Sequence, residues 1–169
     1  MGRPARDVDP RGARGDRTLT IRLSGPAEAE TLFAIQRAAS LAGLAHVYPP
    51  DRYPYPDDAI RERWRTFPGV VHLAEQDGEP VGVAATDDCW LHGFYVVPGH
   101  WGTGVAAALH DAALAPLACS EVKLWVLEEN HRARRFYEKR GWAPNGETRV
   151  VEYPPHPLDV GYSLTQEGA

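Results

Sequence analysis

Residues 96–106 read VVPGHWGTGVA, and this stretch predicts a strand that ends in a glycine-rich turn before a helix. Gly102 and Gly104 remove side chains where the backbone turns tightly, and Ala106 keeps the third position small. Such a turn directs successive N–H groups outward at a helix N-terminus, an arrangement that binds anions. The stretch is not a Walker loop, because no Gly-Lys-Ser/Thr follows, and it lacks the third glycine of a dinucleotide-binding turn. A plain strand-to-helix turn would look the same, so this stretch alone leaves both interpretations open.

A second block, residues 124–142, reads LWVLEENHRARRFYEKRGW. It predicts a short buried strand over 121–127 and then a helix over 130–140, with Ala133, Phe136 and Tyr137 on one side. Asn130 is a residue type that caps helices at their N-terminus, and Gly141 is suited to end this one.

Together the two blocks resemble the GCN5-related N-acetyltransferases, the GNAT superfamily. The family's loop motif is Gln/Arg-x-x-Gly-x-Gly/Ala after a strand ending in Val-x-Pro, and its second motif is Asn-x-x-Ala-x-x-Phe-Tyr-x-x-x-Gly-Phe. The matching residues, within a core of about 70–142, are Leu91, Val96, Pro98, Gly102, Gly104, Ala106, Asn130, Ala133, Phe136, Tyr137 and Gly141, with Trp142 for the usual Phe. Trp101 stands where many members have Gln or Arg, which removes one side-chain donor from the pyrophosphate region.

The resemblance implies acetyl-CoA as cosubstrate, bound between the strand of Val96 and the strand of Trp125. In the family these strands splay apart at a bulge, and Gly93 is well placed to be part of it. We expect no metal cofactor. The cofactor-binding residues that the resemblance implies are Val96, Val97, Gly102, Thr103, Gly104, Val105, Ala106, Asn130, Ala133 and Tyr137.

The rest of the chain predicts an α/β domain with a mixed sheet, in the order β-α-α-β-β-β-α-β-α-β-β. The resemblance implies the GNAT-like version of this fold, a mostly antiparallel central sheet with splayed central strands, flanked by helices. Asp57 or Asp58 is expected to cap the second helix. Strands are predicted at 18–23, 70–75, 80–86, 90–97, 121–127, 148–153 and 159–164, and helices from Pro26 to about Gly43, after Asp57 or Asp58, and over 104–117 and 130–140.

Composition limits the function classes. The 169 residues carry 18 Lys and Arg against 23 Asp and Glu, so a general nucleic-acid binder is not expected. Residues 1–17 hold five Arg and three Asp and are predicted to be a disordered basic tail, which leaves 18–169 as a single domain. No apolar run or leader sequence indicates a membrane or secreted protein, and the two cysteines make neither a disulfide scaffold nor a zinc site. We therefore expect a cytoplasmic protein, and a homodimer is left open.

Two residues are predicted to be catalytic. The resemblance implies that the Tyr137 hydroxyl lies near the sulfur of coenzyme A, where it would protonate or hydrogen-bond the leaving thiolate. Transfer from a tyrosine of pKa about 10 to a thiol of pKa about 8.5 is uphill by roughly 2 kcal/mol. His92 is the candidate general base, because it lies on the strand beside the thioester and has a suitable pKa. Tyr137 as a core aromatic and His92 as an idle strand residue are the alternatives.

Other chemistry is not expected. Cys89 and Cys119 show no base or resolving partner at a useful spacing, so a covalent mechanism through cysteine is not predicted. His110, followed by Asp111, is interpreted as helix surface.

The family builds its acceptor pocket from the first two helices and their connection. Here that region predicts an aromatic wall with nearby Asp51, Asp57 and Asp58, which would attract a small or medium-sized cationic amine. A rigid proline-braced loop without a binding role is the alternative. The acceptor could also be a protein N-terminus or lysine, or the chain could be a non-catalytic acyl-CoA-binding module. The predicted substrate-binding residues are Tyr48, Tyr53, Tyr55, Trp64 and His92.

Overall fold

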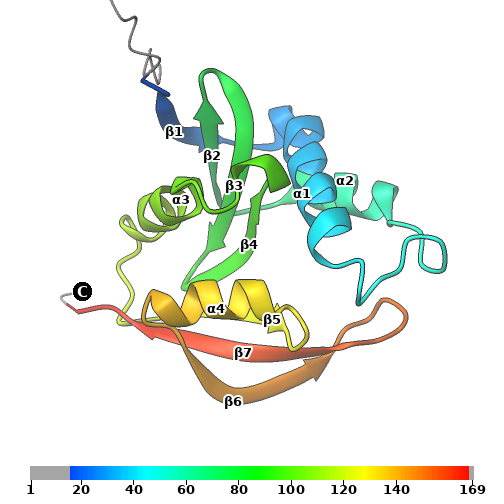
Figure 1. Cartoon of the computed structure of the whole chain (residues 1–169). Helices are drawn as coiled ribbons and strands as arrows, with labels where there is room; N and C mark the ends of the chain where they lie inside the picture. Colours follow the sequence, from blue (N-terminus) through cyan, green and yellow to red (C-terminus); the bar gives the residue numbers. More distant parts are fainter. Residues whose placement is uncertain (1–15, 168–169) are drawn as a thin grey trace, which may run out of the picture.

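The computed structural model describes residues 16–167, so the predicted tail over 1–17 lies almost wholly outside the described residues. Helices and strands follow one another in the predicted order (Figure 1). They are β1 (Leu19–Ser24), η1 (Pro26–Glu28), α1 (Ala29–Gly43), α2 (Asp57–Thr66), β2 (Val70–Gln76), β3 (Glu79–Asp87), β4 (Trp90–Val96), η2 (Pro98–His100), α3 (Val105–Leu114), β5 (Glu121–Leu127), α4 (His131–Lys139), β6 (Ala143–Val150) and β7 (Leu158–Thr165).

The seven strands form one mixed sheet in the order β1-β2-β3-β4-β5-β7-β6. Neighbouring strands are antiparallel except β4 and β5, which are parallel and pair only at Trp90 with Lys123 and Leu91 with Leu124. Beyond these two pairs the strands separate. The predicted α/β fold with a mostly antiparallel sheet and splayed central strands is therefore confirmed.

A β-bulge lies at the point of separation. Ala85 of β3 is opposite Gly93 and Thr86 is opposite Leu91, so His92 is the extra residue of β4. The space at Gly93 is limited, because a Cβ on it would lie 3.3 Å from the Tyr95 ring and in van der Waals contact with Trp64 and Ala85. The predicted role of Gly93 in a bulge is confirmed.

Two apolar cores cover the two faces of the sheet. One face packs against α1 and α2 through residues such as Leu32, Trp64 and Leu73. The other packs against α3 and α4 through residues such as Leu109 and Leu124. β4 contributes to both cores, so its position is fixed from both sides (Figure 1).

Three details of the predicted elements are wrong. α3 ends at Leu114 and not Leu117, because Pro116 has no N–H with which to continue the helical hydrogen bonds after Ala115. β6 begins at Ala143, well before Thr148, because it pairs with β7 from there through a bulged register. Neither Asp caps α2: Pro56 is the N-cap residue, and the Asp57 carboxylate accepts from Arg37 Nε of α1 at 3.0 Å.

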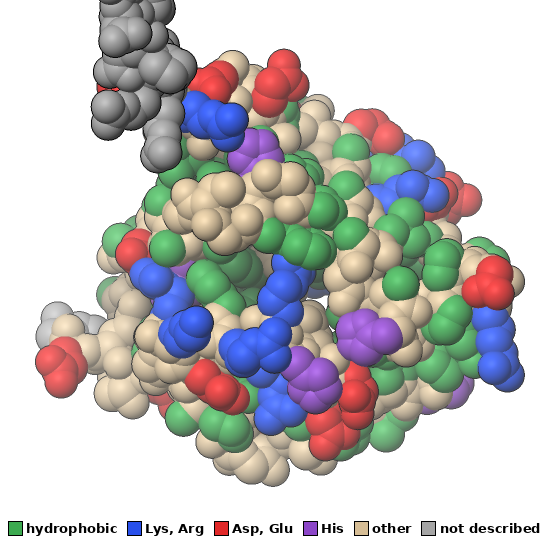
Figure 2. Space-filling view, in the orientation of Figure 1, with side chains coloured by type: hydrophobic (Ala, Val, Ile, Leu, Met, Phe, Trp, Pro, Cys, Tyr) green, Lys and Arg blue, Asp and Glu red, His purple; other side chains and the backbone are tan. Residues whose placement is uncertain are grey.

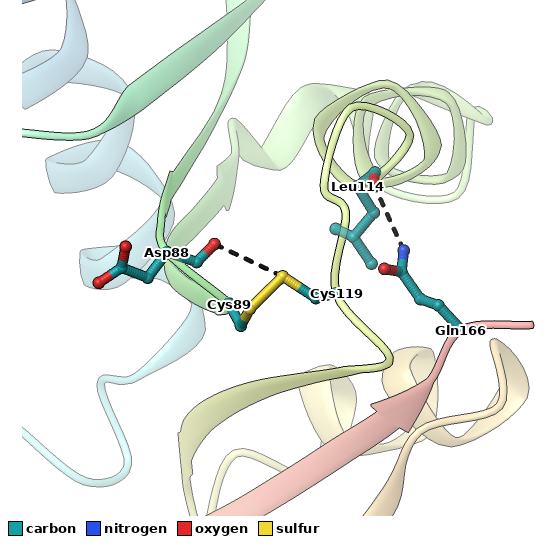
Figure 3. The surroundings of a disulfide bond; sticks show 5 residues. All are labelled: Asp88, Cys89, Leu114, Cys119 and Gln166. Atoms are coloured by element: carbon teal, nitrogen blue, oxygen red, sulfur yellow. Dashed lines mark hydrogen bonds between the residues drawn. A yellow bond between two sulfur atoms is a disulfide. The ribbon is translucent and has the colours of Figure 1, made fainter. Parts of the chain in front are cut away.

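A disulfide joins Cys89, just before β4, to Cys119, just before β5 (Figure 3). The expectation that neither cysteine has a partner is therefore wrong. Although 30 residues separate them in sequence, β4 and β5 are parallel neighbours, and their starting ends bring the two Cα atoms within 5.9 Å. Disulfides are typical of oxidising compartments, so this bond does not support the predicted cytoplasmic location, which stays a prediction. No helix within residues 16–167 is long and apolar enough to cross a membrane.

Opening this disulfide is expected to destabilise the fold, because the bond closes a loop that contains β4, the glycine-rich turn and α3. For a loop of this length the chain-entropy account gives about 3–4 kcal/mol of unfolding free energy. Guanidinium denaturation with and without dithiothreitol measures it. The double variant Cys89→Ser, Cys119→Ser is the control and should not respond to dithiothreitol. A loss below about 1 kcal/mol in the native chain would contradict the prediction.

Candidate active site

A cleft of about 200 Å³ opens beside β4 where β5 has separated from it. Six of the ten predicted cofactor-binding residues line it. The lining comes from α1, from β4, from the loop before α3 together with the start of α3, and from α4. The lining residues are Ala39, Ser40, Gly43, Leu44, Phe94, Tyr95, Val96, Trp101, Gly102, Ala106, Asn130, Arg132, Ala133, Phe136 and Tyr137. A larger and more open hollow of about 530 Å³ lies at the ends of α3 and α4, but it contains none of the predicted site residues.

The glycine-rich turn has the geometry of an anion-binding loop. Gly102 and Gly104 have φ values of 72° and 92°, in the left-handed region that favours glycine, and Gly104 is the N-cap of α3. No side chain caps α3, so the N–H groups of its first turn are left for a ligand. Val105 is buried in the core and Thr103 Oγ1 donates to the His100 carbonyl at 2.6 Å, so both offer the loop backbone groups only.

The backbone directs its groups to opposite sides at Val96, the last residue of β4, and at Val97, which follows it. The N–H of Val97 donates to the Val81 carbonyl of β3 at 2.9 Å, which is away from the cleft. The carbonyl of Val96 accepts from Trp101 Nε1 at 2.6 Å, and both residues line the cleft. We therefore leave Val97 out of the proposed cofactor site and keep Val96.

α4 places Asn130 and Tyr137 on the opposite wall. The Asn130 side chain accepts from the N–H of Ala133 at 3.3 Å, so its predicted capping role is confirmed. Tyr137 lies on the packing face and is 7% exposed. Burial raises the pKa of Tyr137 well above its ordinary value of 10. The hydroxyl therefore stays protonated at any physiological pH and is able to donate a hydrogen bond.

His110 supports this wall and is not the surface residue that the sequence predicts. It is 4% exposed, and Trp142 Nε1 donates to its Nε2 at 2.9 Å. Trp142 packs edge-on against Tyr137, with ring centroids 5.8 Å apart. Burial lowers the pKa of His110, which keeps Nε2 free to accept. No local pattern indicates this burial, because the partner of His110 lies 32 residues away.

Comparison with known proteins decides the family. Residues 33–142 match the model of the acetyltransferase (GNAT) family. The chain belongs to this family. An uncharacterized N-acetyltransferase of Mycobacterium tuberculosis is 40% identical over 95 residues, which cover 52% of this chain and 60% of the relative. The chain thus spans less than two thirds of that relative.

Solved structures agree on the GNAT fold. The apo form of YjaB from Escherichia coli has a TM-score of 0.73 at 23% identity, covering 90% of this chain and 99% of that one. A PaiA N-acetyltransferase from Thermoplasma acidophilum in complex with coenzyme A has a TM-score of 0.64 at 17% identity, covering 88% and 99%. At these identities the likeness concerns the fold alone.

The acceptor side of this GNAT domain differs in part from the predicted one. Trp64 is 2% exposed and donates to Gln36 Oε1 at 2.9 Å, so it is a core residue. Tyr53 is half-buried, with the Arg52 guanidinium 5.7 Å from its ring centre. We leave both out of the proposed acceptor site.

Tyr48 and Tyr55 are half-buried, and neither lines the cleft itself. Burial and the negative charge of Asp159 raise the pKa of Tyr48 to about 12. The Tyr55 hydroxyl is buried near Ser40, and burial raises its pKa to about 12. Sequence reasoning missed Asp159, which is buried on β7, and Tyr95, which lines the cleft from β4. Period-2 alternation along β4 could have found Tyr95, but no local signal points to Asp159.

His92 lies directly after the last residue of β4 that pairs with β5. Its side chain is exposed overall, but the ring is flanked by Phe67 and Trp90, with centroids 5.9 and 6.2 Å away. This partial burial is the main cause that lowers the pKa of His92, and the positive charge of Arg63 lowers it further. His92 is therefore neutral at pH 7 and available as a base, although it does not line the cleft itself.

Replacing Gly104 with valine should weaken coenzyme A binding by about tenfold or more, a loss of about 1.4 kcal/mol. A β-branched residue is strained at a φ of 92° and would turn the loop N–H groups away. Gly99→Val is the matched control, because Gly99 is in the same loop, has open space around it and has no positive φ. Calorimetry of both folded variants measures the effect, and equal affinities would remove the loop from the site.

Proposed function

We propose that this chain transfers the acetyl group of acetyl-CoA directly to the primary amine of a small or medium-sized acceptor, and that residues 18–169 form one acetyltransferase domain. The observation that carries the proposal is the cleft in which the buried Tyr137 of α4 lies across from residues 94–96 of β4. The reaction needs a bound thioester, a neutral amine and a donor for the leaving thiolate.

The residues of the cleft fit acetyl-CoA, which supplies the activated acyl group. The uncapped first turn of α3 offers N–H groups to its diphosphate. The Val96 carbonyl, which already accepts from Trp101 Nε1, has a second lone pair for a pantetheine amide. Gly102, Ala106 and Ala133 keep this path free of bulk. Asn130 would contact the cofactor as well as cap α4.

Tyr137 is proposed as the hydrogen-bond donor to the sulfur. Its raised pKa makes full proton transfer to a thiolate, whose conjugate acid has a pKa of about 8.5, more costly than for an ordinary tyrosine. Donating a hydrogen bond requires no such transfer and stabilises the thiolate as it leaves. The buried site strengthens this bond, since water competes less for either partner.

The change Tyr137→Phe keeps the packed ring and deletes the hydroxyl. We expect turnover to fall about tenfold or more, whereas affinity for coenzyme A stays within about twofold. Tyr162→Phe is the control, because it deletes a partly buried hydroxyl bonded to Glu138 and Arg134. Turnover within about twofold for Tyr137→Phe, with chemistry rate-limiting, would reduce Tyr137 to a core residue.

A small acceptor is favoured by the loop between α1 and α2. His46 Nε2 is 2.8 Å from the Glu129 carbonyl, and Val47 is buried, so this loop is fixed against the start of α4. A loop held by these contacts is less able to move aside for a folded protein acceptor. Tyr48 and Tyr55 are the proposed acceptor contacts. A panel of amines and peptides, with coenzyme A release as readout, tests this choice, and faster acetylation of peptides would reverse it.

His92 is proposed as the base that deprotonates the arriving ammonium group. Because its pKa is lowered, the neutral form dominates at neutral pH, and the rate should rise with pH through a pKa below 6.5. His92→Ala should flatten this limb and leave coenzyme A affinity unchanged. If the rate of the variant still rises with pH in the same way, another group removes the proton from the ammonium.

A further inference from the structure

An unusual stack closes one side of the cleft. The guanidinium of Arg132, in the first turn of α4, lies 3.1 Å from the ring centre of Trp101, in the loop before α3. The indole is itself fixed, because Nε1 donates to the Val96 carbonyl at 2.6 Å. Both side chains line the cleft together with Gly102 and Ala106.

α1 leaves room for this guanidinium. A Cβ on Gly43 would lie 3.1 Å from Arg132 Nη2 and 3.8 Å from the Trp101 ring. Glycine at the end of α1 therefore allows the cation to fit between helix and indole. The position of the Arg132 guanidinium is therefore set by three elements that are distant in sequence: α1, the loop before α3, and α4.

The cation has no counterion within the described part of the chain. Arg134 bonds to Tyr162 and the Glu128 carbonyl, and Arg140 pairs with Asp111. Arg132 has no hydrogen bond or ion pair with any of residues 16–167, and partial burial lowers its pKa. Figure 2 shows Lys and Arg side chains gathered over the face where α4 lies in Figure 1. A positioned, partly desolvated guanidinium without a protein anion is suited to a bound anion.

We propose that Arg132 binds the diphosphate of acetyl-CoA and supplies the cation that the loop lacks at Trp101, with Trp101 as the positioning residue. This inference rests on the proposed function. Trp101 stands where many family members have a Gln or Arg donor in the loop. In this proposal the Trp101 ring instead holds a donor from α4, the Arg132 guanidinium. Arginine suits this role because its planar fork can stack on the indole and still give two parallel hydrogen bonds to a phosphate group.

Calorimetric titration of the full chain with coenzyme A, dephospho-coenzyme A and pantetheine tests the assignment. Arg132→Gln should weaken binding of both coenzyme A and dephospho-coenzyme A by about tenfold or more, and leave pantetheine binding within about twofold. Both arginines are exposed overall, and Arg135→Gln is the matched control because it removes the same charge from a position on the same helix that does not line the cleft. Arg132→Lys keeps the charge but loses the stacked fork, and should bind with intermediate affinity.

The role of Trp101 is tested in the same titrations. Trp101→Phe keeps an aromatic platform and should stay within about threefold of the native affinity, whereas Trp101→Leu should match Arg132→Gln. The double variant Trp101→Leu, Arg132→Gln should then bind no more weakly than either single one, as expected for residues acting through one contact.

Each of the following results would overturn the assignment. Equal losses in Arg132→Gln and Arg135→Gln would show only an effect of overall charge. A loss for coenzyme A without one for dephospho-coenzyme A would move the contact to the 3′-phosphate. An equal loss for pantetheine would show a change in the shape of the cleft. Failure of the native chain to bind coenzyme A would count against the proposed function, whereas native binding with an unaffected Arg132→Gln would count against this inference alone.

Discussion

β4 and β5 are parallel neighbours that pair at only two positions, and the site depends on how they are held after that point. Where the ladder stops, the backbone at Val96 faces the cleft and a helix replaces the missing strand contact. Ladder hydrogen bonds that are not made leave polar groups needing other partners. The disulfide fixes the strands where pairing begins, and Phe136 of α4 stacks on Phe94 of β4 with ring centroids 5.4 Å apart where pairing has ended.

Because β4 and β5 separate, the two faces of the sheet carry different parts of the proposed site. The α3 and α4 face carries the uncapped helix start and the buried Tyr137, which form the proposed thioester site, with His110 and Trp142 packed behind Tyr137. The bulge turns His92 toward the other face, where Phe67 and Trp90 flank it. A single irregular strand thus serves both the proposed cofactor and the proposed acceptor.

The sequence was sufficient to predict the order of elements, the glycine-rich loop, the Asn130 cap and the bulge at Gly93, because each depends on local backbone chemistry. It was insufficient where a residue's role is set by a distant partner. Cys89 and Cys119, His110 with Trp142, and the burial of Trp64 against Gln36 all depend on which strands and helices become neighbours. Trp101 is the clearest case: its mismatch with the family motif was visible, but the Arg132 stacked on it was not.

The central claim is that the opening beside β4 holds the thioester end of the cofactor against Tyr137. A crystal structure of the chain with coenzyme A tests it most directly. The account predicts the sulfur within hydrogen-bond distance of the Tyr137 hydroxyl, between β4 and α4, with the diphosphate at the turn before α3. Coenzyme A bound instead in the open hollow beside Lys139 and Arg140, or with its sulfur remote from Tyr137, would contradict the account.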